Sequence, residues 1–303
     1  MGTEEPTEDI PSKPEVHTNM SDGLRVSTER ACNDPRSTES LIEFALTEED
    51  ENKVWEVVTL LQFRGNRDVF EAARKLCESN HANERRLGAD ILGQLGIPNR
   101  AFPDEAVTIL LGLLENEEDV AVLNSVAVAL GHIGSPRAVE PLSRLKNHPH
   151  KDVRDGVVHG LLTHEDMLAI ETLIELSTDE DEDVRDWATF GLGSMIDTDT
   201  QELRDALAKR LADEDEDTRA EALVGLARRK DERVLDKLIE QLSAESIGSM
   251  SLEASAKMGH TRLCPALLAL KQRWQGERDG HTELLEEAII RCRCEDTSLR
   301  TRG

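Results

Sequence analysis

Aromatic side chains are scarce in this 303-residue sequence, which contains five Phe, three Trp and no Tyr. Sheets favour aromatic and β-branched residues, so this shortage argues against a fold built from strands. Leu, Ala and Glu, which favour helices, recur throughout the chain. The composition therefore predicts an all-α protein.

Long hydrophobic runs are also missing. No segment reaches the roughly 18 consecutive apolar residues that a membrane-spanning helix needs. The chain opens with the acidic segment Met-Gly-Thr-Glu-Glu-Pro and shows no apolar core of the length found in signal peptides. We therefore expect a cytoplasmic protein that has no membrane partner.

Cysteines are few and irregularly spaced, at Cys32, Cys77, Cys264, Cys292 and Cys294. An odd number without a regular pattern does not suggest the disulfide framework of a small secreted fold, so reduced thiols are expected. Three of them could hold zinc, but a Cys-x-Cys on one helix points its sulfurs to different faces. Cys264 and Cys292 are therefore predicted to be small buried hydrophobic residues.

The sequence is strongly acidic, with 62 acidic residues, 36 basic residues and a formal net charge of -26. Such a field repels nucleic-acid phosphates and anionic lipid headgroups. It favours a basic protein as partner and argues against nucleic acid and membranes. A charged surface that only keeps the protein soluble is the other interpretation.

The chain divides into two regions of different composition. Residues 1–38 contain much Pro, Ser, Thr, Glu and Asp and show almost no apolar periodicity. Such a segment buries too little surface to offset the entropy lost on ordering, so a disordered acidic and polar tail is predicted. In residues 39–303, short apolar-periodic blocks alternate with turn residues, which predicts a repeat domain.

One helical pattern recurs along the second region. In the block at 84–96, apolar residues at 91, 92 and 95 share one face of a helix. Copies begin 29 to 38 residues apart, which is enough for two short helices and their turns. The second position of each copy is Val54, Arg85, Leu123, Arg154, Arg185, Arg219, Gly248 or Thr282. The first helix of each pair is predicted at 68–77, 104–114, 136–145, 166–176, 200–211, 232–242 and 262–274.

The repeat carries a signature. Asp-Val-Arg at 152–154 and 183–185 and Asp-Thr-Arg at 217–219 each precede small residues and Gly-Leu, and Ala-Leu-Gly-His-Ile-Gly stands at 129–134. This pattern resembles the short HEAT-like repeats of the phycobilisome-lyase type. The resemblance implies an α-solenoid, a right-handed superhelix of about seven to eight antiparallel helix hairpins whose second helices line the concave side.

The signature residues have structural roles in this interpretation. Asp152, Asp183 and Asp217 are predicted to cap the second helices by accepting free backbone N–H groups. The arginines that follow them, Arg154, Arg185 and Arg219, are predicted to bridge to acidic or carbonyl groups of an adjacent unit. Gly160 and Gly225 are among the small residues expected to let neighbouring helices approach closely.

Two enzymatic alternatives follow from the resemblance. Some relatives attach or chaperone tetrapyrrole chromophores, and HEAT-type repeats also build the iron-dependent deoxyhypusine hydroxylase family. That hydroxylase places His-Glu pairs at the start of several second helices, whereas the one such pair here, His164-Glu165, falls at a helix end. We therefore predict a non-catalytic, protein-binding scaffold or adaptor with no cofactor. Chromophore attachment remains the alternative, and a metal-dependent hydroxylase is less favoured.

Histidines offer the other candidate chemistry. His148, His150, His159 and His164 lie close together in sequence, with aspartates nearby. Zinc could bind if three such side chains converged, but their spacing matches no established site. No Gly-rich phosphate loop, nucleophile elbow or catalytic triad can be singled out. The sequence therefore predicts no metal site and no catalytic residue.

Two surfaces are candidates for partner contact. The acidic runs at 179–183 and 213–217 fall in the turns of successive repeats, so stacking would align them as a ridge that attracts a basic partner. Solvated turns are the alternative for these runs. The exposed side chains of the concave face are the other candidate. The predicted contacts are Asp179, Glu180, Asp181, Asp213, Glu214 and Asp215 on the ridge, and Asp155, His159, Asp186, Phe190 and Ala220 on the concave face.

Overall fold

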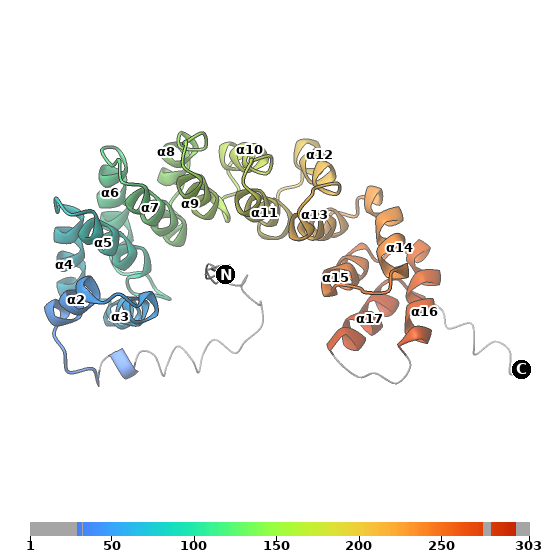
Figure 1. Cartoon of the computed structure of the whole chain (residues 1–303), viewed down its shortest axis with the longest axis horizontal. Helices are drawn as coiled ribbons and strands as arrows, with labels where there is room; N and C mark the ends of the chain where they lie inside the picture. Colours follow the sequence, from blue (N-terminus) through green and yellow to red (C-terminus); the bar gives the residue numbers. More distant parts are fainter. Residues whose placement is uncertain (1–28, 32, 275–279, 295–303) are drawn as a thin grey trace, which may run out of the picture.

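A computed structural model of the chain describes residues 29–31, 33–274 and 280–294. Within these residues the sixteen helices α2 to α17 pair in chain order as eight antiparallel hairpins, and there is no strand. The hairpins stack side by side into an arch (Figure 1). The predicted all-α solenoid is confirmed.

The first helices of the hairpins are α2 (Thr38–Thr47), α4 (Arg67–Cys77), α6 (Pro103–Leu114), α8 (Val139–Ser143), α10 (Met167–Leu176), α12 (Gln201–Arg210), α14 (Leu235–Ser243) and α16 (Cys264–Arg273). The second helices are α3 (Glu51–Arg64), α5 (Ala82–Gln94), α7 (Val120–Ile133), α9 (Lys151–Leu161), α11 (Glu182–Phe190), α13 (Glu216–Arg228), α15 (Ser249–Met258) and α17 (Gly280–Arg291). From α5 to α17 the second helices line the inner side of the arch, as predicted (Figure 1).

Short helical turns complete four of the hairpins. The 3-10 turns η1 (Pro136–Ala138), η3 (Glu232–Val234) and η4 (Thr261–Leu263) lead into α8, α14 and α16. A π-helical turn, η2 (Gly191–Met195), continues α11. The first-helix ranges predicted from the sequence therefore agree with the structure to within a few residues.

Small residues allow the second helices to approach closely. A Cβ added to Gly225 would lie 2.5 Å from Cα of Gly193, and one added to Gly131 would lie 2.7 Å from Cα of Gly160. These distances leave no room for alanine, so neighbouring hairpins would have to move apart. The predicted role of Gly160 and Gly225 is confirmed.

The predicted helix caps are wrong by two positions. Asp152, Asp183 and Asp217 are each the second residue of their helices, where a negative charge still favours the helix dipole. The caps are His150, Asp181 and Asp215. The carboxylate of Asp181 accepts a hydrogen bond from the backbone N–H of Val184, three residues later. This is the contact that an N-cap residue, just before the first helical residue, makes.

Two of the three predicted arginines tie their turn to the next hairpin, whereas the contacts of Arg219 among the described residues are to the carbonyls of Asp213 and Glu214 in its own turn, so that part of the prediction is wrong. Arg154 donates to both carboxylate oxygens of Asp179 at 2.7 Å, and Arg185 contacts Asp213 at 3.2 Å. Arg154 and Arg185 also donate to the backbone carbonyl six residues earlier in their own turns. Arg85 repeats the arrangement with Glu117. This arginine ladder fixes successive turns to one another.

The folded region begins before the predicted boundary at residue 38. Ala31 is almost completely buried, and Arg64 of α3 donates to the backbone carbonyls of Asp34 and Arg36. Residues 29–31 and 33–38 therefore pack against the solenoid on the N-terminal side of the predicted boundary, and the disordered tail stays a prediction. Residues 1–28 lie outside the described residues.

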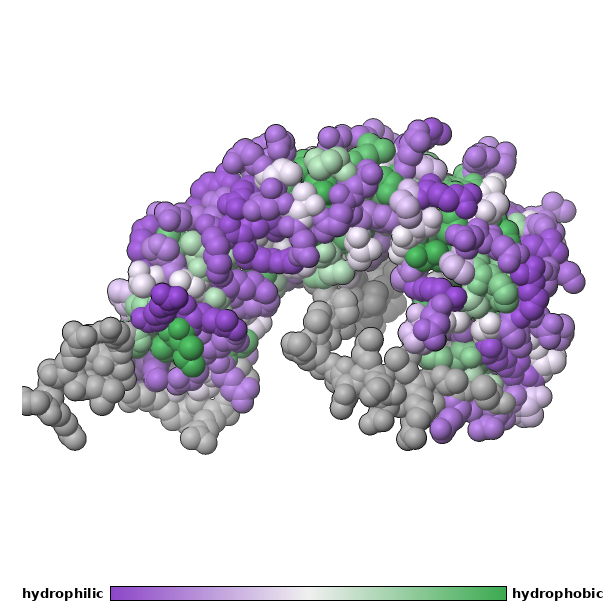
Figure 2. Space-filling model, turned by 180° about the vertical axis from the view of Figure 1, so that it is seen from behind, coloured by the Kyte–Doolittle hydropathy of each residue, from purple (hydrophilic) through white to green (hydrophobic). Residues whose placement is uncertain are grey.

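Seen from behind, hydrophilic residues cover most of the arch and hydrophobic ones show as scattered patches (Figure 2). Among the helices that the structure describes, none is long and apolar enough to span a bilayer.

Candidate functional site

The acidic ridge predicted from the sequence does not form as a free surface. The side chains of Asp179 and Asp213 are only 7% and 5% exposed, because both are paired within the arginine ladder. Burial acts to raise the pKa of Asp179, but hydrogen bonds from Arg154 and from the backbone of Asp181 outweigh it and lower the pKa. These carboxylates hold the turns together, so they are unavailable to a partner.

The remaining ridge residues divide into two groups. Asp181 and Asp215 are helix caps, and Asp181 also lies 3.2 Å from Nζ of Lys151. Glu180 and Glu214 are exposed on separate turns. Glu180 lies 3.6 Å from the guanidinium of Arg154, so Glu214 is the one exposed ridge carboxylate that neither caps a helix nor pairs with a cation among the described residues.

A pocket opens instead on the concave face, where α5, α7, α9 and α11 meet. It has a volume of about 340 Å³, at the lower end of the range found for binding pockets. Its lining residues are Arg86, Ala121, Asn124, Ser125, Lys151, Asp152, Asp155, His159, Asp181, Asp183, Val184 and Trp187. Of the predicted concave contacts, Asp155 and His159 therefore lie in this pocket.

The wall of the pocket on the α11 side is aromatic. The ring of Trp187 lies 4.6 Å from that of His159, and Phe190 meets Trp187 edge-on at 5.6 Å. His159 also approaches Asp155, at 3.6 Å from Nε2 to the carboxylate. Burial lowers the pKa of His159 to about 4, so this ring is neutral at physiological pH. The wall is therefore aromatic and carries no positive charge of its own.

Negative charge exceeds positive charge around this wall. The lining contains four aspartates but only two cationic side chains, Arg86 and Lys151. Lys151 is shared between Asp181 at 3.2 Å and Asp183 at 3.5 Å. Burial, with the nearby charge of Asp183 next in importance, raises the pKa of Asp155 to about 6. Asp155 therefore lies among carboxylates that the chain's own cations only partly neutralise.

A second buried carboxylate lies at the edge of the pocket. Burial raises the pKa of Asp90 to about 6, and a hydrogen bond from Ser125 partly opposes the increase. Ser125 itself lines the pocket. Asp90 on α5 and Asp155 on α9, two hairpins apart along the arch, are thus both partly desolvated carboxylates near this pocket.

The other predicted concave contacts lie elsewhere. Asp186 and Ala220 are half-buried and do not line this pocket, and Phe190 lines a second groove farther along the arch. Trp187 was not predicted as a site residue. The alignment of the repeats could have identified Trp187. It lies 31 residues after Gly156, at the same position of the next repeat, so a large aromatic residue stands where the preceding repeat has glycine.

The histidines of the predicted cluster do not converge. His150 caps α9, His148 accepts a hydrogen bond from the backbone of His150, His164 is buried near the end of α9, and His159 faces the concave pocket. In the part of the chain that the structure describes, no three His, Cys, Asp or Glu side chains are grouped to hold a metal ion.

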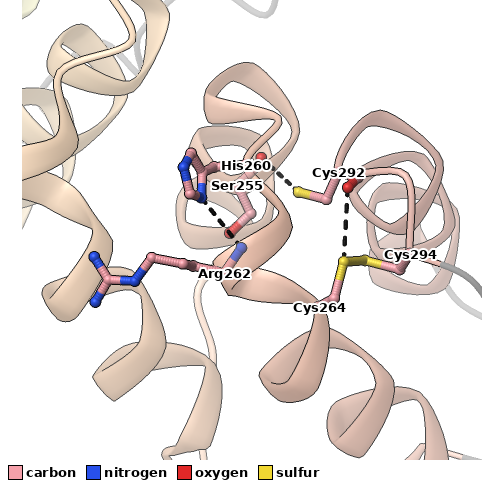
Figure 3. Close-up of a disulfide and its surroundings, with 6 residues drawn as sticks. All are labelled: Ser255, His260, Arg262, Cys264, Cys292 and Cys294. Carbon is pink, nitrogen blue, oxygen red and sulfur yellow. Dashed lines mark hydrogen bonds between the residues drawn. A yellow bond between two sulfur atoms is a disulfide. The ribbon is translucent and has the colours of Figure 1, made fainter.

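The cysteine prediction is partly wrong. Cys264 forms a disulfide with Cys294, and their Cα atoms are 5.2 Å apart (Figure 3). Cys292 is buried with a free thiol, as predicted, and its Sγ lies 3.4 Å from the carbonyl oxygen of Ser255. The pairing could not be seen in the sequence because stacking of α16 against α17 brings together residues 30 positions apart.

Comparison with known proteins identifies the repeat. A model of HEAT repeats matches residues 85–162 and 170–249, which together are just over half of the chain. The chain therefore belongs to the HEAT repeat family.

Two Escherichia coli comparisons extend the match. The chain is 29% identical to Protein YibA of strain K12 over 214 residues, covering 69% of this chain and 76% of YibA. The X-ray structure of YibA superposes with a TM-score of 0.69 at 24% identity, covering 94% of this chain and all of that one. The superposition supports the fold and carries no statement about activity.

The families behind the two enzymatic alternatives give weaker likenesses. The CpcE–CpcF complex of phycocyanin lyase from Nostoc sp. PCC7120 has a TM-score of 0.46 at 18% identity, covering 85% of this chain and 96% of that one. Human deoxyhypusine hydroxylase has a TM-score of 0.33 at 17% identity, covering 90% of this chain and 99% of that one. Neither likeness is high enough to argue for an activity here.

Proposed function

We propose that this HEAT repeat protein is a non-catalytic scaffold whose concave pocket binds a cationic side chain from a basic segment of a partner protein. The observation that carries the proposal is the pocket between α5 and α11, where four aspartates outnumber two cations beside Trp187. The exposed part of the acidic ridge would contribute only long-range attraction.

Physical chemistry favours a cation in this pocket. A guanidinium or ammonium group over an indole face gains roughly 0.5 to 2 kcal/mol, with the larger value when the site is desolvated. Asp155 and Asp183 could accept its hydrogen bonds, and charged hydrogen bonds are stronger than neutral ones. Burial is the main cause of the raised pKa of Asp155, and a guest cation would relieve the repulsion by Asp183 that adds to it.

The surroundings favour a protein segment over an isolated small molecule. The pocket is one part of a continuous concave face built from many repeats, and such faces suit extended partners. With a net charge of -26, long-range attraction also favours a basic polypeptide and disfavours nucleic acid. The cytoplasmic location stays a prediction. Labelling of free thiols in intact cells would test it, because an unoxidised Cys264 would fit a reducing compartment.

A random peptide library displayed on phage tests the proposal. Peptides selected on the full chain should be enriched in Arg or Lys, and their binding should fall at least about tenfold on Trp187→Ala or Asp155→Asn. Trp55→Ala is the matched aromatic control, since Trp55 is 45% exposed and lies outside the pocket. Glu180→Gln is the matched charge control on the ridge.

The outcomes separate the hypotheses. Selected peptides without cationic residues, or equal losses on Trp55→Ala and Trp187→Ala, would contradict the pocket as the binding site. An equal loss of peptide binding in the Glu180→Gln variant would indicate that the peptides bind the acidic ridge. Stoichiometric iron or a tetrapyrrole absorbance band in the purified protein would contradict the non-catalytic scaffold.

A further inference from the structure

A second, larger hollow occupies the concave face near the other end of the arch. It extends from α11 across α13 and α15 to α17 and has a volume of about 1540 Å³. Phe190 lines this groove and also contacts Trp187 of the pocket described above. The groove and the pocket are therefore neighbouring parts of one concave surface.

The groove has the opposite charge balance to the rest of the molecule. Its lining contains five cationic side chains and three carboxylates, in a chain whose net charge is -26. The cationic residues are Arg228, Lys230, Lys257, Arg291 and Arg293. A local excess of positive charge is thus concentrated on the last three hairpins.

These cations are held in two different ways. Arg228 and Lys230 donate to backbone carbonyls, Arg228 to that of Ser194 and Lys230 to that of Lys257. Arg228 also forms an ion pair with Asp197, whereas Lys230 pairs with no carboxylate among the described residues, so Lys230 supplies the fixed positive charge of the groove. Among the described residues, Lys257 and Arg291 each form a single surface pair within their own helix, at 3.4 Å from Glu253 and Glu287. Such pairs contribute little, so both cations could exchange their helix partners for a ligand's carboxylates.

Apolar side chains lie between the charges. Met250 of α15 and Leu284 and Ile290 of α17 line the groove, and Ile290 is 70% exposed. An isoleucine that exposed gains free energy when another apolar side chain covers it. The groove therefore combines an apolar contact surface with a cationic rim.

We propose that this groove binds an acidic amphipathic helix of a protein partner. Its apolar face would cover Met250, Leu284 and Ile290, and its carboxylates would pair with Lys257, Arg291 and Arg293. This is the helix-in-groove mode of recognition with anionic specificity added. The site lies beyond the cation-binding pocket of the proposed function and does not depend on it.

A protein segment fits better than nucleic acid. Phosphate backbones carry no apolar groups to cover Ile290, and a long polyanion would also meet the repulsion of a chain with a net charge of -26. A short helix with few carboxylates meets less of this repulsion and gains the apolar contact.

The test uses a fluorescein-labelled amphipathic peptide of Leu, Ala and Glu, and the same peptide with Gln in place of Glu. Anisotropy should show binding of the Glu peptide to the full chain, weakening with added salt. The triple variant Lys257→Gln, Arg291→Gln, Arg293→Gln should weaken binding about tenfold, since three screened charges each contribute a few-fold. Ile290→Ser should weaken binding of both peptides, because it removes apolar contact.

Controls keep this result independent of the pocket. The triple variant Arg144→Gln, Lys237→Gln, Arg262→Gln makes the same charge change at residues outside the groove and should leave binding unchanged. Phage-selected cationic peptides should bind the groove variant as well as they bind the original chain. If the cationic peptides bind and the Glu peptide does not bind even the original chain, the groove proposal is wrong and the pocket proposal is unaffected.

Three other outcomes would overturn the proposed occupant. Equal binding of the Gln peptide would remove the role of the cationic rim. Tighter binding of labelled single-stranded DNA would assign the groove to nucleic acid. Binding of the Glu peptide only after deletion of residues 1–28, which include six acidic residues and two Lys or Arg, would assign the groove to the chain's own N-terminal segment.

Discussion

Replacing Asp155 with Asn is expected to stabilise the protein while weakening the proposed cation-binding pocket. Asp155 has an ordinary pKa of 3.8, and burial among like charges raises it to about 6. A carboxyl group whose pKa is raised by folding binds its proton more tightly in the folded state. Its ionisation therefore costs stability, and this cost is fully present above the folded pKa and absent below the unfolded one.

The magnitude follows from the pKa shift. At about 1.4 kcal/mol per pKa unit, the cost of ionising Asp155 grows from roughly 1.5 kcal/mol at pH 5 to roughly 3 kcal/mol at pH 8. These values are upper bounds because the side chain keeps 29% of its exposure. Asn has nearly the same shape and no charge, so Asp155→Asn should recover part of this free energy, with the larger gain at pH 8.

Urea unfolding followed by circular dichroism at several pH values between 5 and 8 measures this gain. His159 stays neutral in that range, because burial lowers its pKa to about 4. Asp68→Asn is the control, since this exposed residue in the first turn of α4 should lose a small favourable dipole interaction, an effect of opposite sign. A stability gain that does not grow with pH would refute the burial of an uncompensated charge at Asp155.

Three further predictions concern stability. Arg154→Met should lower the free energy of unfolding in urea by about 3 to 5 kcal/mol, because it leaves Asp179 buried and unpaired. The control Arg144→Met removes an exposed pair and should lower it by under about 1 kcal/mol. Equal losses would contradict the structural role of the arginine ladder. Arg229→Met should cost about 2 to 4 kcal/mol in the same assay, since four backbone carbonyls lose a buried donor, and a neutral result would show that water replaces it. Cys294→Ser should destabilise the last hairpin by roughly 3 to 4 kcal/mol, the entropic contribution expected for a crosslink that spans 30 residues. Amide hydrogen exchange should become faster in α16 and α17 only. Faster exchange throughout the chain would contradict a local role of the disulfide.

Most of the fold could be predicted from the periodicity of the sequence. The spacing of apolar positions placed the helix pairs, because each hairpin must bury one stripe against its neighbours. The arginine at one place per repeat was predicted to bridge units, and Arg154 and Arg185 do so, whereas Arg219 contacts carbonyls of its own turn. The caps were misplaced because Asp152 and Asp183 also suit a first helical turn, and sequence alone does not separate these two positions.

The site was harder to predict because it depends on contacts between repeats. The acidic runs suggested a surface ridge, yet Asp179 and Asp213 are internal partners of arginines in the preceding repeat. The pocket was only partly anticipated, since Asp155 and His159 were identified but their aromatic neighbour Trp187 was not. Burial of a polar residue is set by its neighbours in space, and one sequence does not reveal them.

Site-specific photo-crosslinking tests the central claim most directly. Benzoylphenylalanine at Ala121, an exposed pocket residue, is compared with the same group at Glu140 on the outer helix α8, in the cells that make this protein. We expect crosslinks from position 121 to protein segments rich in Arg or Lys, and their loss on Asp155→Asn. Equal crosslinking from position 140, or crosslinks from 121 that lack cationic residues and persist on Asp155→Asn, would contradict the concave pocket as a site for a basic partner.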